Sequence, residues 1–565
     1  MQIIQIFLAS FIVTFSFFVF GNFISKKVIS ENTQIKISLE CIYGSILISF
    51  FSLFLNFFIP INKMVGNIFI LLSLFLFIIL LKFKKIKFNF EVFISLLLIS
   101  LISLILILYS NINRPDAGLY HLPYVKIIQD YKIIFGLSNI HHRFGHISIV
   151  QYLSSIYNNS LFPKEIFLLP LSILVSSFYF YIISHFRKKK NLKNDETILI
   201  FFIGIFVFYS FNRYSNFGND ATSHIFFFLF LIQLFKFREC INNIDSIANL
   251  SLLSTFAFLQ KTSMILILIV PFVLYLFFFI KNFEFYKNKK ILLSFFFIIF
   301  WILKNTIVSG CIIYPVSLTC INNFEITNYE ETKYIENETE SWAKDWPNKK
   351  NKSIKMIDYN KNLNWFSTWK ENHFKFVQKK FLPFLITILI LFIVLNFIYK
   401  KKKFDKNDEK IDKLKYLICF SLCMMLSMFW FLKFPVYRFG QSYISGTLIV
   451  LFSYLFVVNI ELNKIKYILR ILIIVFFIGA ISKNLIRISD SHNFKNPWPN
   501  IYTLSENKSK NIKRENIPIF YDNEFVYFFS KTECLFNESP CSNYLKKNII
   551  KTKKYSYEFF ISKSE

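Results

Sequence analysis

The chain of 565 residues is 54% hydrophobic and only 18% charged, and it contains 76 phenylalanines. Such a composition excludes an ordinary water-soluble domain and indicates a protein embedded in a bilayer. The net charge of +30 arises largely from lysines in loops on one side of that bilayer, so it does not indicate a nucleic-acid partner.

The apolar segments predict the architecture. A helix that crosses a bilayer needs about 20 apolar residues, and about 14 segments are candidates, of which the one at 247–259 is short. We therefore expect an all-α polytopic membrane domain over residues 1–487. The segments are centred near Ser10, Ile48, Leu72, Leu101, Leu174, Gly204, Leu229, Leu253, Val273, Phe297, Leu389, Leu422, Leu451 and Val475.

The distribution of lysine and arginine predicts the orientation. Alternate connections are rich in basic residues, as in 82–87, 187–193 and 400–415. The short connections between them hold only five basic residues, which are Lys63, Arg213, Lys261, Lys433 and Arg438. Because basic loops stay in the cytoplasm, we expect loop 110–165, segment 311–379 and the C-terminal tail to lie on the extracytoplasmic side.

The first outer loop, residues 110–165, carries the first candidate site. Asp116 follows the span that ends near Tyr109, and Tyr120 and His121 come soon after it. Two apolar stripes at helical spacing, at 120–134 and 147–156, predict two short amphipathic helices on the outer membrane surface. Asp116 fits a general base, and it also fits a helix-capping residue.

Four of the eight histidines of the chain lie in this loop, three of them in the run His141, His142, Arg143 and His146. Imidazole and guanidinium groups at an outer membrane surface suit the binding of a sugar or a phosphate. A divalent metal site is an alternative, but the three histidines do not share one helical face, so Asp116 or His121 would have to complete it. Ordinary interfacial histidines are the third interpretation.

Three later outer connections each contribute an ionisable residue. Asp220 follows the sixth apolar segment, and Lys261 lies between the eighth and the ninth. Arg438 stands between aromatic residues ahead of the thirteenth. Asp220 is a second candidate for a catalytic carboxylate. Lys261 and Arg438 would suit a lipid phosphate, although a lysine at this depth also fits an interfacial side chain that reaches for water.

The long outer segment 311–379 is polar and rich in tryptophan, with Trp342, Trp346, Trp365 and Trp369. Such rings stack on sugars or anchor a protein at the membrane interface.

Two pairs of cysteines fall on the predicted outer side, where disulfides form. We expect one disulfide between Cys311 and Cys320 and another between Cys534 and Cys541. The tail, residues 488–565, includes strand-like runs at 517–521 and 525–529. It is long enough for a small α/β appendage outside the membrane.

The block from Asp116 to Pro123, with Lys261-Thr262-Ser263, Lys304-Asn305, Tyr314-Pro315 and Tyr437-Arg438-Phe439, resembles the GT-C superfamily of integral-membrane glycosyltransferases. The likeness is strongest to relatives of the protein mannosyltransferases and the lipid A aminoarabinose transferases. The chain departs from them in having three spans before the one that leads to Asp116, and in having Ala117 where a second acid is common.

The resemblance implies a sugar donor linked to polyprenyl phosphate and an acidic catalytic residue in the first outer loop. It also implies a site on the extracytoplasmic face of the bacterial inner membrane. Asp116 or Asp220 would then be catalytic, with substrate bound by Tyr120, His121, His141, His142, Arg143, Lys261 and Arg438. The resemblance implies no definite cofactor. The acceptor could be a glycan, a lipid or a protein.

Two other functions remain open. An O-antigen polymerase or ligase also acts on lipid-linked substrates, but segment 311–379, the large loop, contains one histidine and no arginine. A flippase for lipid-linked oligosaccharides would need polar residues along the middle of several spans, and the apolar segments here are nearly uncharged. The chain also lacks the glycine-rich motifs of nucleotide-binding proteins and the H-E-x-x-H motif of zinc proteases.

Overall fold

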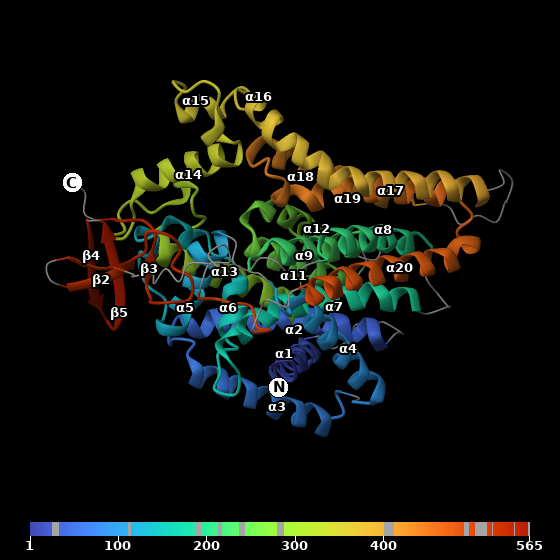
Figure 1. The fold of residues 1–565 in the computed structure, drawn as a ribbon, viewed down its shortest axis with the longest axis horizontal. Coiled ribbons are helices and arrows are strands. Elements are labelled where there is room, and N and C mark those ends of the chain that lie inside the picture. The colour runs from blue at the N-terminus through green and yellow to red at the C-terminus, as the bar shows by residue number, and fades with distance from the viewer. Residues whose placement is uncertain are drawn as a thin grey trace.

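The computed structural model describes residues 1–24, 33–86, 88–110, 115–187, 194–212, 217–236, 243–279, 288–399, 412–490, 496–502, 517–521, 524–546 and 548–562. It is a bundle of mostly aligned helices with polar segments and a small β-region gathered at one end (Figure 1). We call this the loop end of the bundle. It is formed by residues 115–165, residues 310–365 and the described strands of the C-terminal tail.

Ten helices within the described residues are long and apolar enough to cross a bilayer, so the chain is a multi-pass membrane protein. They include α3 and α17, whose outward surfaces are apolar, with side chains such as Phe75 and Ile393 largely exposed. The ten are α1 (Gln2–Ile24), α2 (Thr33–Asn56), α3 (Lys63–Lys82), α4 (Phe90–Ile107), α7 (Leu169–Arg187), α13 (Lys289–Ser309), α17 (Lys375–Tyr399), α18 (Lys413–Lys433), α19 (Tyr437–Asn459) and α20 (Leu462–Ser489).

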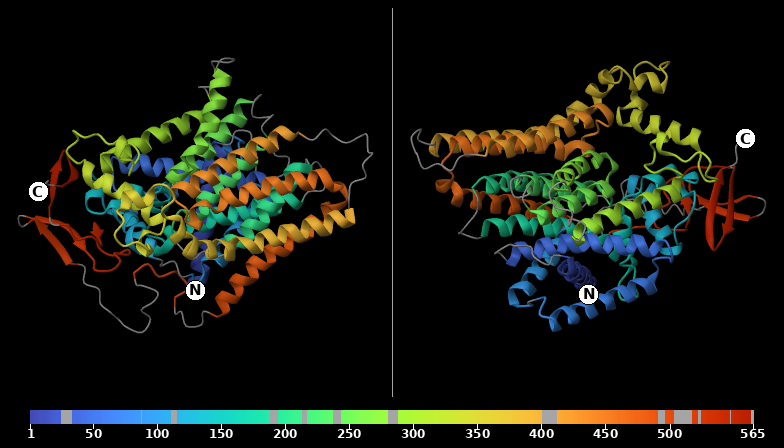
Figure 2. Two further views of the ribbon diagram at one scale, coloured as in Figure 1. Left: turned by 90° about the horizontal axis from the view of Figure 1, so that it is seen from above. Right: turned by 180° about the vertical axis from the view of Figure 1, so that it is seen from behind.

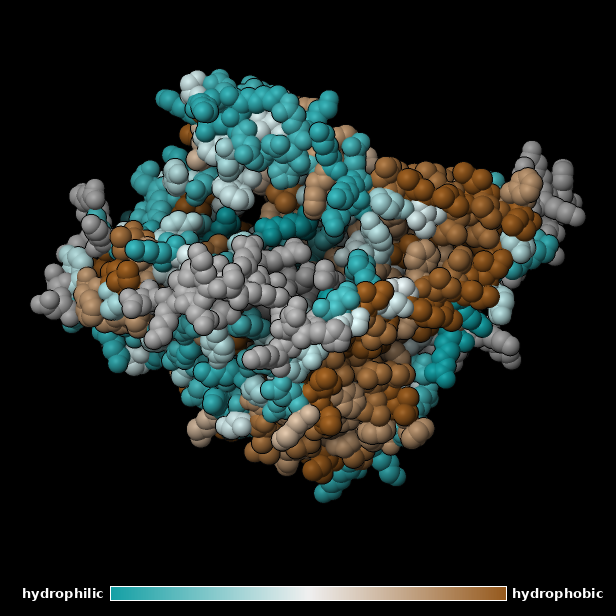
Figure 3. All heavy atoms as spheres, in the orientation of Figure 1, coloured by the Kyte–Doolittle hydropathy of each residue, from teal (hydrophilic) through white to brown (hydrophobic). Residues whose placement is uncertain are grey.

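Figure 3 shows the same division on the surface. Hydrophobic residues cover the side where α17 and α20 lie, and hydrophilic residues cover the part over α14 (Tyr329–Ala343), α15 (Met356–Asn360) and α16 (Phe366–Trp369). Apolar surface of this extent on a monomer is what lipid contact requires.

The remaining four of the expected spans are also helices, but they are shorter. They are α8 (Asn194–Ser210), α9 (Asp220–Leu234), α11 (Ile244–Gln260) and α12 (Ile269–Phe279). At 1.5 Å per residue the longest of them spans only about 25 Å, less than the roughly 30 Å of a hydrocarbon core. The figure of fourteen complete spans therefore stays a prediction.

Close helix contacts hold the N-terminal part of the bundle together. A side chain on Gly21 of α1 or Gly44 of α2 would put its Cβ 1.7 Å from the Glu40 carbonyl oxygen or 1.8 Å from that of Phe17. Only glycine permits this approach, as is common between membrane helices. Serine hydroxyls join other pairs, such as Ser103 of α4 and Ser172 of α7 at 2.7 Å.

Two ion pairs lie at the end of the bundle opposite the loop end. Lys415 of α18 forms an ion pair with Asp195 of α8, and Lys236 forms one with Glu196. These basic residues belong to the connections predicted to be cytoplasmic. The alternation of basic loops along the sequence thus distinguishes the same two ends of the bundle that the structure shows.

The first loop folds into the protein and does not lie beside it. A π-helical turn (Ala117–His121) continues into α5 (Leu122–Asp130), and α6 (Ile149–Ser155) packs against α5. All seven residues of α6 are buried. The prediction of an amphipathic helix on the membrane surface is therefore wrong for α6, because its apolar residues face other helices on every side. α5 is amphipathic, with its apolar face turned inward.

The tail forms β1 (Ile517–Tyr521), β2 (Glu524–Phe529) and β3 (Cys541–Ser542) in one sheet, and β4 (Ile549–Lys554) and β5 (Tyr557–Ser562) in another. The strands lie at the loop end in all views (Figures 1 and 2). The strands of the expected α/β tail are present, and the described tail residues beyond α20 include no helix.

The tail is attached to the first loop by hydrogen bonds. The amide of Leu535 donates to the Gly118 carbonyl at 2.8 Å, and the Ser542 hydroxyl donates to the Ile140 carbonyl at 3.0 Å. Asn139 donates to the Phe560 carbonyl at 2.8 Å. The tail is therefore part of the surface that the first loop forms.

Candidate functional site

Four charged residues from four separate segments meet at the loop end. Asp116 precedes the π-helical turn, and Asp220 is the first residue of α9. Lys261 caps the C-terminus of α11, and Arg438 lies in the first turn of α19. The structure thus brings together the four ionisable residues that the sequence places in four different outer connections. We call them the charge cluster.

The charge cluster consists of two ion pairs joined through Arg438. The Arg438 guanidinium donates to the Asp116 carboxylate at 2.5 Å, and the Lys261 ammonium donates to the Asp220 carboxylate at 2.6 Å. Lys261 also lies 3.4 Å from the Arg438 carbonyl oxygen. Its ammonium is 4.2 Å from the ring centre of Phe439, which also lies near the Arg438 guanidinium.

Helix dipoles favour some of these positions and oppose one. A carboxylate at a helix N-terminus and an ammonium at a helix C-terminus are both favourable, as at Asp220 and Lys261. Arg438 stands at the positive N-terminus of α19, where a cation is unfavourable. The local sequence therefore gives Arg438 no helix-stabilising role, and the carboxylate of Asp116 is its ion-pair partner.

His224 of α9 fixes the start of α19 against the cluster. Its Nε2 donates to the Arg438 carbonyl at 2.8 Å, and its Nδ1 lies 2.7 Å from the Ser442 hydroxyl. His224 is fully buried. The sequence indicates only that it follows Asp220 by one helical turn, which would place both on one face of α9.

Burial sets the charge state of the residues around the cluster. Burial lowers the pKa of Lys261, and the carboxylate of Asp220 opposes that effect. Burial lowers the pKa of His121 to about 4, so its ring is neutral at pH 7. The His121 Nδ1 accepts a hydrogen bond from Gln151 at 2.7 Å. The ring of Tyr120 lies beside it in a tilted arrangement, with ring centres 4.3 Å apart.

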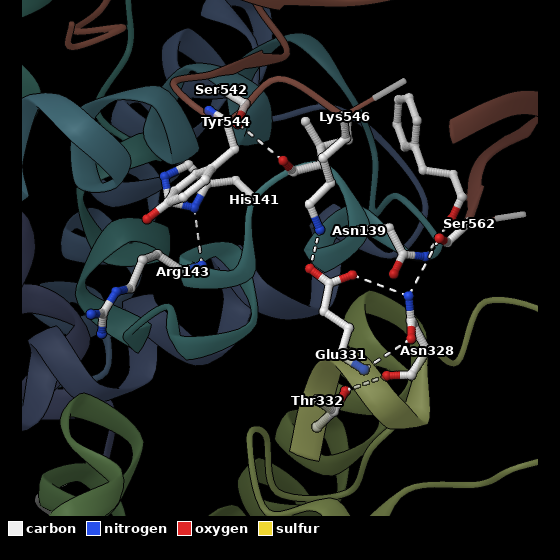
Figure 4. A network of polar contacts seen from close by, with 12 residues as sticks. Asn139, His141, Arg143, Asn328, Glu331, Thr332, Ser542, Tyr544, Lys546 and Ser562 are labelled. Carbon is white, nitrogen blue, oxygen red and sulfur yellow. Dashed lines mark hydrogen bonds and ion pairs between the residues drawn. The ribbon is translucent and has the colours of Figure 1, made fainter. Parts of the chain in front are cut away.

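The histidine run forms a second group nearby (Figure 4). Tyr544 of the tail contacts the rings of both His141 and His142, at 4.9 and 5.0 Å between ring centres. Burial lowers the pKa of His141 far below its usual value and that of His142 to about 3. The backbone amide of Arg143 donates to the His141 Nδ1 at 3.1 Å.

The histidines do not form a metal site. Within the described ranges, no three or more side chains of His, Cys, Asp or Glu are grouped so that they could hold a metal ion. His141 and His142 pack against Tyr544, and His146 packs against Tyr314. The metal interpretation therefore has no geometric support here.

The family of the chain follows from its match to a family model. The model of DUF8201, described as a domain of unknown function, matches residues 3–445. The chain belongs to the DUF8201 family. No curated protein and no solved structure matches it. The matched residues of this DUF8201 protein include the whole charge cluster and the histidine run, and the β-strands of the tail lie beyond them.

Two of the tryptophans in segment 311–379 have structural roles. Trp365 and Trp369 are 1% and 4% exposed, and the Trp369 indole donates to the Pro435 carbonyl at 2.7 Å. They hold the connection that precedes Arg438. Trp342 is 59% exposed and remains available for contact with a ligand or an interface.

The DUF8201 chain has both disulfides that the sequence predicts. Cys311 is bonded to Cys320, and Cys534 is bonded to Cys541. The second disulfide closes the loop that begins beside Gly118 of the π-helical turn. It therefore fixes a tail segment that borders the site.

Proposed function

We propose that this protein is a membrane glycosyltransferase of the GT-C type, with the charge cluster as its active centre. It would move a sugar from a polyprenyl-phosphate donor to a glycan, lipid or protein acceptor on the extracytoplasmic face of the bacterial inner membrane. The single observation that supports this most is the convergence of Asp116, Asp220, Lys261 and Arg438 at one end of the bundle. Carboxylates and cations in contact are what transfer from a lipid phosphate requires.

In this proposal Asp116 is the general base. Its carboxylate takes the proton of an acceptor hydroxyl while that oxygen forms a bond to the anomeric carbon of the donor sugar. The bond from that carbon to the phosphate oxygen breaks, and the phosphate leaves with the bonding electrons. A single displacement of this kind inverts the anomeric configuration. No general acid is needed, because the leaving phosphate is a weak base.

The ion pair of Asp116 with Arg438 adds a control step. While they are paired, the guanidinium occupies one oxygen of the carboxylate that would accept the proton. A donor phosphate that binds Arg438 would compete with Asp116 for the same N–H groups, because guanidinium binds phosphate and carboxylate alike. Donor binding would thus free the base, and it would supply the cation that stabilises the leaving phosphate.

Asp220 is the competing base. Its ion pair with Lys261 is less exposed than that of Asp116 with Arg438, since Lys261 is only 9% exposed. Replacing the partner of a buried charge costs more free energy than replacing the partner of a half-exposed charge. We therefore assign the base to Asp116, with Asp220 holding Lys261 in place beside the donor phosphate.

The distribution of these groups supports an enzyme over a flippase, because they gather at one end of the bundle. The test is reconstitution of the purified protein in vesicles with radiolabelled polyprenyl-phosphate sugars and an envelope lipid extract. Mass spectrometry of the products, compared with vesicles that lack the protein, identifies the acceptor. Label that crosses the bilayer without a new covalent product would favour the flippase. A product elongated by whole repeat units would favour the polymerase.

A further inference from the structure

A second group of side chains next to the charge cluster has the properties of a subsite for an anionic sugar. Its centre is Arg143, which lies in the 3-10 turn (His142–His146) of the first loop and is half-buried. Within the residues that the structure describes, its guanidinium forms no hydrogen bond and no ion pair. Figure 4 shows this guanidinium pointing away from the polar network that joins its neighbours to the tail.

The contrast with the other cations at the loop end is informative. Arg438 and Lys261 each have a carboxylate partner, and Lys546 of the tail is paired with Glu331 of α14. Arg143 has none, although Glu331 and Glu338 contribute to the electrostatic surroundings of the adjacent Tyr314. An unpaired, partly desolvated guanidinium is costly unless a ligand supplies the anion.

Aromatic rings from three segments lie against the histidines on either side of Arg143. Between ring centres, Tyr120 of the π-helical turn lies 6.4 Å from His141, Tyr544 of the tail lies 5.0 Å from His142, and Tyr314 lies 5.2 Å from His146. Tyr544 is 42% exposed although it packs against His141 and His142. An exposed tyrosine ring beside a free arginine suits a sugar ring and a charged substituent together.

A buried polar atom on the inner side of the group supports the same conclusion. The Nε2 of His146 is buried and has no hydrogen-bond partner within the described residues. Its ring lies against Tyr314, 5.2 Å away between ring centres. Burial is the main cause that lowers its pKa, and Arg143 is the next. At pH 7 the His146 ring is therefore neutral. Arg143 is the group here that carries the positive charge an anion would bind.

Tyr120 connects this group to the charge cluster. Its ring centre lies 6.4 Å from that of His141, and Asp116, Arg143, Arg438 and Asp220 are all close enough to affect the pKa of its hydroxyl. A sugar that is bound at Arg143 could therefore present a hydroxyl toward Asp116. The reverse arrangement, with the donor phosphate at Arg143, would place the leaving group away from Arg438 and Lys261.

We infer that Arg143, Tyr544 and Tyr314 form the acceptor subsite and that the acceptor is a sugar with a negatively charged substituent, a carboxylate or a phosphate. This inference rests on the proposed transferase function. Arg143 binds the anionic group in a two-pronged contact, and Tyr544 stacks on the sugar ring. The specificity of the reaction for an acidic acceptor then resides in a residue that takes no part in the chemical step.

The test is a binding measurement on the full chain in nanodiscs, by saturation-transfer difference NMR with glucose, glucuronic acid and glucose 6-phosphate. The two anionic sugars should bind about tenfold or more tightly than glucose, as charge-assisted hydrogen bonds predict. Arg143→Gln should abolish that preference and Arg143→Lys should retain part of it. Lys132→Gln is the matched control, because Lys132 lies elsewhere on the first loop, beside Tyr557 and Ser556. It should leave the preference unchanged.

A measurement on the unmodified protein keeps the inference testable if a variant does not fold. The preference for anionic sugars should decrease as the salt concentration rises from 0.05 to 0.5 M, because exposed charges are screened. Whichever anionic sugar binds more tightly identifies the substituent. Equal binding of glucose and both anionic sugars, a preference that salt does not change, or an equal loss in Lys132→Gln would overturn the inference.

The failure of this inference and that of the proposed function are distinguishable. A protein that prefers anionic sugars but transfers no sugar from any polyprenyl-phosphate donor has the subsite without the proposed activity. A protein that transfers sugar equally to neutral and acidic acceptors has the activity without the subsite.

Discussion

Removal of the Arg438 guanidinium should separate a catalytic role from a structural one. In Arg438→Gln the backbone carbonyl of residue 438, which accepts from His224 and Lys261, is retained. The lost ion pair is half-exposed, with Arg438 at 44% and Asp116 at 28%. Exposed pairs contribute about 0.2 to 1 kcal/mol, so the free energy of unfolding should decrease by no more than about 1 kcal/mol.

The expected loss of activity is much larger. If Arg438 stabilises the leaving phosphate, its removal should lower the rate of sugar transfer by about 10²- to 10³-fold, as loss of one preorganised charge does in other enzymes. The assay is transfer from a radiolabelled polyprenyl-phosphate sugar in vesicles, with thermal unfolding followed in parallel. Lys433→Gln is the matched control, because Lys433 pairs with Glu340 and lies outside the cluster. Normal transfer by Arg438→Gln, or the same loss in Lys433→Gln, would refute the phosphate assignment.

Three further predictions follow from the same geometry. Lys261→Met leaves Asp220 without its partner, so it should destabilise the protein by about 3 kcal/mol or more, and Asp220→Asn in the same chain should recover part of that loss in a thermal unfolding assay. Because the pKa of His121 is about 4 in the folded protein and about 6.5 when unfolded, the free energy of unfolding is highest above pH 6.5. His121 alone should account for about 3 kcal/mol of the fall as the pH decreases from 6.5 to 4, and His121→Gln should reduce the total fall by about that amount; a curve unchanged in the variant contradicts the assignment. Cys534→Ala should lower stability by about 2 to 3 kcal/mol through loss of the disulfide with Cys541, and labelling of all four outer cysteines without reductant would contradict both disulfides.

Much of the helical arrangement could be predicted because it follows from composition. Each of the expected apolar segments lies in a helix, since a run of apolar residues in a bilayer has no other way to satisfy its backbone. The lengths of α9 and α12 could not be predicted, because helix ends depend on polar partners such as Lys261 that come from distant segments. α6 was also mispredicted, since one apolar stripe does not reveal that all its other sides are packed.

The candidate site was only partly accessible from the sequence. Orientation by basic loops places Asp116, Asp220, Lys261 and Arg438 on one side, but only the fold shows which cation pairs with which carboxylate. The tail carried no sequence signal for the site, because Tyr544 is more than 400 residues from His141 along the chain. No local pattern predicts such a contact. The sequence does mark Arg143 as a candidate binding residue, but it does not show that the acids of the same loop, such as Asp116 and Asp130, pair with other cations.

The most direct test of the central claim is sugar transfer by Asp116→Asn beside Asp220→Asn in folded, membrane-inserted protein. Asparagine keeps the size of the side chain and removes the basic carboxylate. Asp116→Asn should therefore lower the rate by about 10²- to 10⁴-fold, and Asp220→Asn should have the smaller effect. A larger loss in Asp220→Asn would exchange the two roles. Normal transfer by both variants would contradict a catalytic carboxylate in the charge cluster, and with it the proposed mechanism.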